Sequence, residues 1–525
     1  MRSALLAAVV AIPLAVLGPP GGDVPAHLYR TLLVREGDLV WDNLWYGGHY
    51  PLASYSLLYY LPATVFGNLP LVVAAAVAAA FLFGSIAERE WGERARWPSR
   101  AFAVAAAAPI FTGTYTYALG LAAALGSLRA LQSGRIWLGI LLAALTMGFS
   151  PLAFVFLCIA LGAIAIARPR FDRPAIVVAV AAALVAAAQA LAVWLFPHEA
   201  VYPFRLLELG IVLGVGAFGA ALCARVPAAR VVGVLFALWA LVSVAVFLVP
   251  SPIGENATRL RGIVFPLMLL GAALVRFRPV WLAVPALAGA LAYNLVPYVA
   301  VIPHRTDGRP AEAAYWEPAL DFVRARSAPS FRVEVVPTGD HWEAYWVPKA
   351  GLALARGWYR QLDIAQNPLF YRAPLRPGEY RAWLRSMGVR YVLLPDTQIG
   401  RYGEEREADL LRSGRSGLVE AFTTADWRVF ELPDATPILS GPAGARLSAL
   451  EHERIAGSTR TSGDYRLAVR FTPYWRVRRG DVCLERAADG MTRLAARRPG
   501  PFELVIDESP GALLHAMANR RGDVC

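Results

Sequence analysis

Apolar and polar positions follow two different patterns along this chain of 525 residues. Over residues 1–303, long apolar stretches are separated by short polar connections, whereas residues 304–525 alternate apolar and polar positions at much shorter intervals. A helix needs about 20 predominantly apolar residues to cross a bilayer, so the first pattern predicts membrane-spanning helices. The clearest predicted spans are residues 4–18, 69–87, 174–196, 206–223, 231–249, 263–275 and 279–302.

Two further apolar stretches, 101–132 and 135–167, are too long for one span at a rise of about 1.5 Å per residue. Each contains a central break, which is Thr112-Gly113-Thr114 in the first stretch and Gly-Phe-Ser-Pro at 148–151 in the second. We expect each stretch to form a helical hairpin. The fold expected for residues 1–303 is therefore a polytopic α-helical membrane domain of about eleven spans.

The arginines predict how these spans are oriented. With these spans and a cytoplasmic N-terminus, fourteen arginines fall in cytoplasmic connections and only five fall outside, as the positive-inside rule requires. This places the N-terminus in the cytoplasm, and an odd number of spans places residues 304–525 outside. We expect a multi-pass protein of the cell membrane with an extracytoplasmic C-terminal region.

Charged residues are also distributed unevenly. Residues 1–304 carry 30 charged side chains and residues 305–525 carry 60, so the C-terminal region is water-soluble in character. The net charge of +12 belongs mainly to the short membrane connections, and the C-terminal region has no dense basic run. Nucleic acid is therefore excluded as a partner. The chain also lacks a phosphate-binding Gly-rich loop with Lys and the common hydrolase motifs.

The C-terminal region reads as two parts. Residues 304–435 alternate helical and strand patterns, which predicts an α/β domain, and residues 436–525 contain short alternating runs that predict a β-sandwich-like domain. An extracytoplasmic location would permit a disulfide between Cys483 and Cys525, although sequence cannot establish its geometry. The expected elements are helices at 313–325 and 379–387 and strands at 332–336, 389–394, 427–432, 465–471 and 502–506.

The first outside loop, residues 19–68, contains an unusually polar stretch at 21–51. Asp23, His27 and Arg30 are spaced i, i+4 and i+7, so a helix starting after Pro25 would place them roughly on one face. Acid, imidazole and guanidinium groups on one face suit proton transfer beside a bound phosphate. The alternative is that a loop at the bilayer surface is charged in any case.

Two other groups of residues on the outside are candidates for binding. The second half of the polar stretch suits a sugar-stacking wall or, alternatively, a membrane-interface belt of aromatic side chains. Its candidate acceptor- or sugar-binding residues are Asp42, Asn43, Trp45, Tyr46, His49 and Tyr50. Arg259 and Arg261, in a later outside loop, could clamp a lipid phosphate or serve only as snorkelling anchors.

The string Asp23-Val-Pro-Ala-His27-Leu-Tyr-Arg30 resembles the first outside loop of GT-C glycosyltransferases, including the catalytic subunits of oligosaccharyltransferases. The phrases WDNLWYGGHYPL, RGWYRQLDIAQNPLFY and VRYVLLPD look like those of GT-C-like membrane proteins of actinobacteria, some of which are labelled as related to 6-pyruvoyl-tetrahydropterin synthase. The resemblance implies that Asp23 is the catalytic or metal-binding acid and that Arg259 or Arg261 contacts the donor phosphate. It also implies a polyprenyl-phosphate sugar donor and inversion at the sugar carbon.

The sequence therefore leads to the hypothesis of a GT-C-type membrane glycosyltransferase that moves a sugar to an envelope glycan, lipid or protein. Asp23 would act in catalysis while His27 and Arg30 orient the substrate. A divalent cation, Mg²⁺ or Mn²⁺, would bind Asp23 if the enzyme uses one, but no second acidic pair such as Asp-x-Asp supports this. The alternatives are a non-enzymatic scaffold with a glycan- or partner-binding tail and a transporter or flippase of lipid-linked substrates.

Overall fold

The computed structural model describes residues 1–51, 56–169, 172–197, 200–277, 280–299, 307–400, 403–442, 444–512 and 514. The chain divides into two compact units, which we describe separately. The membrane unit comprises Met1–Val24, Tyr55–Ala192 and Ala200–Pro303. The tail unit comprises Pro25–Ser54, Val193–Glu199 and His304–Cys525.

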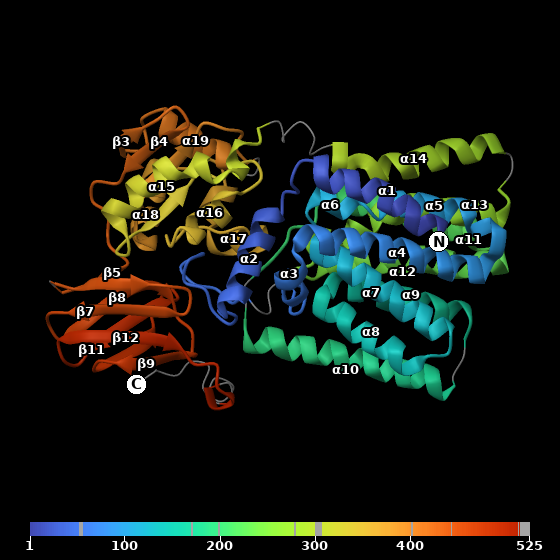
Figure 1. The fold of residues 1–525 in the computed structure, drawn as a ribbon, viewed down its shortest axis with the longest axis horizontal. Coiled ribbons are helices and arrows are strands. Elements are labelled where there is room, and N and C mark those ends of the chain that lie inside the picture. Colours follow the sequence, from blue (N-terminus) through green and yellow to red (C-terminus); the bar gives the residue numbers. More distant parts are fainter. Residues whose placement is uncertain are drawn as a thin grey trace. The chain divides into compact units, whose positions relative to one another are not determined.

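Helices build the membrane unit, and α7 packs against α8, α4 and α9 (Figure 1). The breaks expected inside the two long apolar stretches are present. Gly113 ends α6 in the left-handed conformation with φ of +81°, and the Ser150 side chain caps α9. The helices are α1 (Arg2–Leu17), α3 (Tyr60–Phe66), α4 (Asn68–Trp91), α5 (Arg96–Ala105), α6 (Ala108–Thr112), α7 (Tyr115–Gln132), α8 (Ile136–Phe149), α9 (Pro151–Ala167), α10 (Arg173–Leu195), α11 (Leu206–Cys223), α12 (Arg230–Leu248), α13 (Val264–Val275) and α14 (Val280–Val299), with 3-10 turns η1 (Gly92–Ala95), η2 (Pro227–Ala229) and η3 (Gly254–Ile263).

Among the described residues, five helical segments are long and apolar enough to cross a membrane: Asn68–Thr112, Arg173–Leu195, Leu206–Cys223, Pro227–Leu248 and Gly254–Val275. Shorter apolar helices lie at Arg2–Leu17, Ile136–Phe149, Pro151–Ala167 and Ala283–Val296. Length and composition thus support a helical membrane protein, and the expected count of about eleven spans is not confirmed.

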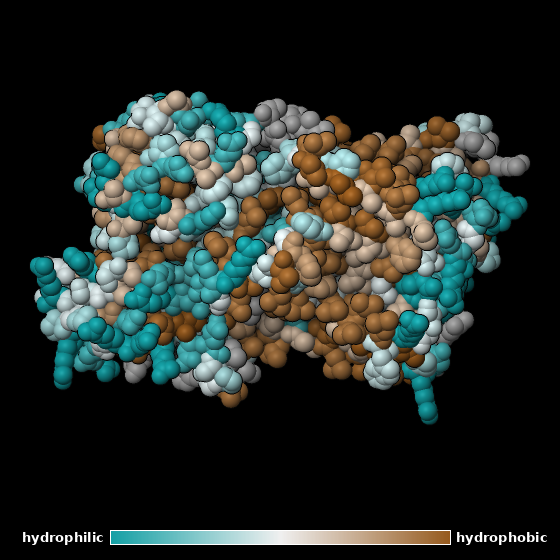
Figure 2. Space-filling model, viewed as in Figure 1, coloured by the Kyte–Doolittle hydropathy of each residue, from teal (hydrophilic) through white to brown (hydrophobic). Residues whose placement is uncertain are grey.

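The surface of the membrane unit is apolar, as contact with lipid requires. Figure 2 shows broad hydrophobic areas over its helices. Trp137 and Leu141 on α8 and Leu184 on α10 are among the exposed large hydrophobic side chains, and α10 has no buried residue. A soluble protein rarely exposes apolar area on this scale, because covering it from water is favourable.

A mixed sheet forms the first part of the tail unit, in the strand order β1-β2-β4-β3. Strand β1 runs parallel to β2, whereas β4 is antiparallel to both β2 and β3. Its strands are β1 (Arg332–Val335), β2 (Val389–Pro395), β3 (Val419–Thr423) and β4 (Trp427–Glu431). Its helices are α15 (Ala313–Ser327), α16 (Glu343–Lys349), α17 (Arg360–Gln366), α18 (Pro377–Met387) and α19 (Glu404–Arg412), with 3-10 turns η5 (Arg309–Ala311) and η6 (Pro368–Tyr371).

Two antiparallel four-stranded sheets form the second part, in the orders β10-β11-β8-β5 and β6-β7-β12-β9. Leu467 and Leu494 of one sheet share a buried core with Phe502 and Leu504 of the other, which makes this part a sandwich (Figure 1). Across both parts of the C-terminal region, the two helices and five strands expected from the sequence are all present, with bounds that differ by a few residues. The sandwich strands are β5 (Leu439–Ser440), β6 (Arg446–Leu450), β7 (Arg454–Thr459), β8 (Gly463–Arg470), β9 (Trp475–Arg479), β10 (Val482–Arg486), β11 (Met491–Ala496) and β12 (Gly500–Ile506).

The division into units differs from the expected domain boundary at residue 303, because most of the first outside loop belongs to the tail unit. Helix α2 (Val24–Glu36) opens this loop. Trp41, Leu44 and Tyr50 join the core of the sandwich, where burial removes their large apolar surfaces from water. Sequence placed them in the membrane domain because their partners lie about 400 positions away. Cys525 lies outside the described residues, so the disulfide to Cys483 is not described.

Candidate functional site

Asp23 lies in the membrane unit, directly before the first residue of α2. Its backbone is pinned against Gly113 at the end of α6, where an added Cβ would come within 2.7 Å of the Asp23 nitrogen. Gly21 also lies against Gly113: a Cβ added to Gly21 would come within 2.3 Å of the Gly113 nitrogen. Only glycine fits such close backbone contacts. These two glycines therefore fix where Asp23 stands on the membrane unit.

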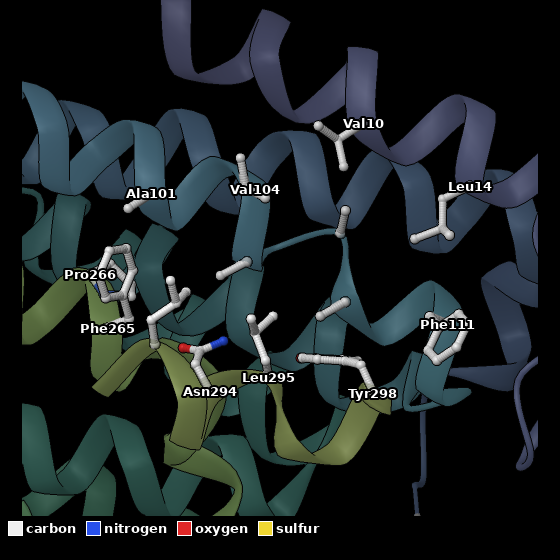
Figure 3. A pocket seen from close by; sticks show the side chains of 14 residues that line it. Val10, Leu14, Ala101, Val104, Phe111, Phe265, Pro266, Asn294, Leu295 and Tyr298 are labelled. Carbon is white, nitrogen blue, oxygen red and sulfur yellow. The ribbon is translucent and has the colours of Figure 1, made fainter. Parts of the chain in front are cut away.

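A partly open cavity of about 430 Å³ lies among helices of the membrane unit, and its lining includes the exposed side chains of Val104 and Leu295 (Figure 3). Of its fourteen lining residues, only Asn294 and Tyr298 on α14 carry polar side-chain atoms. Figure 3 shows Phe111 of α6 beside Tyr298 at one end, and their ring centroids are 6.2 Å apart. Phe111 stands two residues before Gly113, the residue whose backbone approaches that of Asp23, and Asp23 itself is not among the lining residues.

Arg259 and Arg261 both lie on η3, which leads into α13 and the cavity wall at Phe265. The Arg261 guanidinium contacts the Glu208 carboxylate at 3.5 Å and lies within electrostatic range of Tyr298. Arg259 lies within electrostatic range of Tyr117 on α7.

The candidate sugar-binding residues belong to the tail unit, and all six are buried there. Trp45 packs its ring against Tyr29 at 4.5 Å and donates from Nε1 to the Ala344 carbonyl. The Tyr46 hydroxyl accepts from the Tyr359 amide at 2.8 Å. A sugar stacks on an exposed aromatic face, so Trp45 and Tyr46 could bind one only after their rings were uncovered.

The remaining sugar-binding candidates have partners of the same structural kind. Asn43 accepts a hydrogen bond from Trp41 Nε1 at 2.7 Å and donates to the Glu451 carbonyl at 2.8 Å. The Tyr50 hydroxyl donates to Thr472 Oγ1 at 2.7 Å. The bonds to Glu451 and Thr472 join the loop to the sandwich. The candidate sugar-binding residues at 42–50 are thus largely part of the buried core of the tail unit.

His27 and Arg30 also lie in the tail unit and are buried. The Arg30 guanidinium donates to the Tyr359 hydroxyl at 2.9 Å and to the Pro51 carbonyl. The backbone carbonyl of His27 accepts from the Thr31 hydroxyl. Arg30 thus connects the start of the loop at 25–51 to its last residue, Pro51, and to Tyr359.

A polar group that sequence reasoning missed surrounds Asp42, whose side chain is fully buried. Tyr29 donates to Asp42 Oδ2 at 2.8 Å, and His452 Nδ1 lies 3.0 Å from Oδ1. His452 sits in the turn between β6 and β7, where its only sequence signal was a histidine flanked by acids in Leu-Glu-His-Glu-Arg. We call Tyr29, Asp42, His452, Glu36 and Asp38 the Asp42 cluster.

Electrostatics set the protonation states in this region. Burial raises the pKa of Asp42, but the hydrogen bond from His452 and the charge of His452, together with the Leu44 amide, outweigh it and hold the pKa below its ordinary value. Burial lowers the pKa of His452, whereas Asp42 and the nearby acids raise it more. Burial lowers the pKa of His49 to about 4 despite Asp42 at 3.6 Å, so His49 is neutral at pH 7.

Among the residues that the structure describes, one group has the donor atoms to hold a metal ion, and it consists of Glu36, Asp38 and His452. Asp23, the metal ligand that sequence suggested, does not belong to it.

The fold and these sites define a helical membrane protein with a C-terminal region of sheets. No family model matches the chain, and no curated protein matches it.

Proposed function

We propose that the protein is an integral-membrane glycosyltransferase of GT-C type. It moves a sugar from a polyprenyl-phosphate carrier to an envelope glycan, lipid or protein on the extracytoplasmic side. The observation that carries the proposal is the apolar pocket in the membrane unit, whose wall includes Phe111, two residues before the Gly113 that contacts the Asp23 backbone, and Phe265, which follows Arg261 in the chain. A hydrocarbon chain fits such a cavity, and an anionic headgroup favours a site beside arginine.

In the proposed reaction, an acceptor hydroxyl attacks the anomeric carbon of the donor sugar. The bond from that carbon to the phosphate oxygen breaks, and the acceptor's proton passes to the Asp23 carboxylate. Arg259 and Arg261 stabilise the negative charge that develops on the leaving phosphate. His27 and Arg30 are given no direct step in this scheme, because both side chains are buried. A divalent cation is not required by this scheme.

The proposed topology keeps about eleven spans, with the N-terminus in the cytoplasm and the tail unit outside. Its support is that residues Pro25–Ser54 share one compact unit with His304–Cys525. Segments that share a core lie on the same side of a membrane. The first loop and the tail then require an even number of crossings between them, which agrees with one span before the loop and ten after it.

The test is transfer of labelled sugar from a panel of polyprenyl-phosphate donors in proteoliposomes. Asp23→Asn is expected to lower the transfer rate by about 10²- to 10⁴-fold, the usual contribution of a general base. Asp409→Asn is the matched control, because its carboxyl lies on the surface of the tail unit and pairs only loosely with Arg412 at 3.8 Å. Arg261→Gln should raise the KM for the donor.

Equal transfer by wild type and Asp23→Asn would remove Asp23 from the mechanism. Donor movement across the bilayer without transfer would favour a flippase. A folded protein that binds glycan but neither transfers sugar nor moves donor would favour a scaffold.

A further inference from the structure

Three side chains with metal-binding atoms lie close together where the end of α2 meets the turn between β6 and β7. Glu36 is the last residue of α2, Asp38 follows two residues later, and His452 lies in the turn between β6 and β7. Their donor atoms lie within 4.8 Å of one another. One imidazole nitrogen and two carboxylate oxygens suit Zn²⁺ or Mn²⁺, whereas Ca²⁺ and Mg²⁺ prefer oxygen ligands alone.

A buried carboxylate outside this group holds its histidine in position. Asp42 Oδ1 accepts from the Leu44 amide at 2.9 Å and faces His452 Nδ1 at 3.0 Å, while Oδ2 accepts from Tyr29. Because an ionised carboxylate can only accept, the His452 proton must lie on Nδ1. The other nitrogen, Nε2, is then directed at Glu36, 3.4 Å from its Oε2.

This is the arrangement by which proteins prepare a histidine to bind metal, since a carboxylate on the far nitrogen fixes the tautomer and raises the basicity of the ligating nitrogen. The surroundings also favour a cation. Asp38 lies within electrostatic range of Glu36, Asp42 and Glu451, so negative charge accumulates around one imidazole. Glu36 is partly exposed, which gives an ion access from solvent.

We propose that Glu36, Asp38 and His452 Nε2 bind one divalent transition-metal ion, with Zn²⁺ as the preferred ion and Asp42 as a positioning residue. Three protein ligands leave a coordination position open to water. The ion ties the end of α2 to the β6–β7 turn, across more than 400 positions of sequence. This site goes beyond the proposed transferase function and does not depend on it.

The experiment uses the full chain, purified in detergent without a polyhistidine tag and stripped of metal by a chelator. Zn²⁺, Mn²⁺ and Ca²⁺ are titrated by calorimetry, and the melting temperature is followed with and without Zn²⁺. Wild type is expected to bind one Zn²⁺ per chain and to melt at a higher temperature when it is bound. Glu36→Gln and Asp38→Asn, at partly exposed positions, should each weaken binding by at least about 10-fold.

Asp464→Asn is the control, because this exposed carboxylate of the same sandwich pairs with Arg493 instead. It should bind Zn²⁺ as wild type does, and so should Asp23→Asn, which separates this test from that of the transferase. Wild-type affinity in both Glu36→Gln and Asp38→Asn would overturn the proposal. So would the absence of a stoichiometric Zn²⁺ site, which would leave a protonated His452 as the counter-ion of these acids, or a preference for Ca²⁺.

Discussion

Two groups of buried charge in the tail unit differ in how completely they are enclosed. In the α/β part, the Arg356 guanidinium donates to Glu334 Oε1 at 2.7 Å and to Glu407 Oε2 at 2.6 Å, with Asp363 at 3.9 Å. All four side chains are buried. The Asp42 cluster is also anchored by a buried acid, but it continues through His452 to the partly exposed Glu36.

The partners of the acids in the Arg356 group show what enclosure means. Tyr380 donates to Glu407, and Tyr371 and Asn367 both donate to Asp363. These donors come from the same fold, so most of the group is satisfied internally, and among its described carboxylate oxygens Glu334 Oε2 is buried without a hydrogen-bond partner. In the Asp42 cluster, by contrast, the Glu36 carboxylate, which could coordinate a metal ion, is partly exposed to solvent. A buried network of the first kind specifies the fold, whereas an open cluster of the second kind is suited to binding.

The sharpest way to test this contrast is to remove the central cation of the enclosed group. Arg356→Met keeps much of the aliphatic side chain but leaves three buried carboxyls around it, which should destabilise the tail unit by about 3–5 kcal/mol at pH 7. Chemical denaturation of the full chain in detergent measures this. Arg324→Met, which removes a surface arginine paired with the exposed Asp321, should cost less than about 1 kcal/mol.

The pH dependence of the Arg356→Met deficit has a defined sign. Burial raises the pKa of Glu334, Glu407 and Asp363. A carboxyl whose pKa is raised on folding is best tolerated below its unfolded pKa and destabilises as the pH rises through its folded value. The deficit should therefore shrink as the pH falls. A deficit that is constant with pH would show that lost packing against Phe370, and not buried charge, is responsible.

A second, somewhat smaller effect is expected from His49, which lies beside the Asp42 cluster. Its pKa is lowered by burial to about 4, with Asp42 raising it and Arg30 and His452 lowering it. A lowered pKa means that the stability contribution of neutral His49 is complete above about 6.5 and is lost as the pH falls toward 4. The loss between pH 7 and pH 4 should be on the order of 3 kcal/mol.

His49→Phe isolates this titration. The replacement keeps a flat ring that can stack on Trp45, whose ring centroid is 5.7 Å away, and His49 makes no side-chain hydrogen bond among the described residues. Stability measured from pH 7 to pH 4 should fall less steeply in the variant than in wild type. Parallel curves for the two proteins would mean that His49 is not the residue that titrates.

Local sequence patterns predicted the elements of the tail unit well. Strand β2 has buried apolar side chains on both faces, and α18 ends at Gly388 in the left-handed conformation, so both were recognisable from nearby residues. The break at Gly113 was equally local. Such signals need only the few residues around them, because period, caps and glycine conformations act within one turn or strand.

The sites could be predicted only in part, because their partners are distant in sequence. Asp42 was singled out as a sugar ligand, yet its neighbour His452 lies 410 positions later. Arg356 was noticed only as the first residue of a familiar phrase, and its charge partners come from three other segments. Asp23, by contrast, was identified from its own neighbours, and the placement of Gly113 against it could not have been read from them.

The smallest expected effect gives the closest comparison of the open and enclosed groups. With metal removed by a chelator, Glu36→Gln should change the free energy of unfolding by less than about 0.5 kcal/mol, because a half-exposed carboxylate contributes little to stability. With saturating Zn²⁺ the same substitution should separate the two proteins clearly, since wild type gains more binding energy than the weaker-binding variant. Denaturation curves of both proteins with and without Zn²⁺ measure this difference. A large cost in chelator would mean that Glu36 is part of an enclosed structural network like that of Arg356, and the contrast between the two groups would fail.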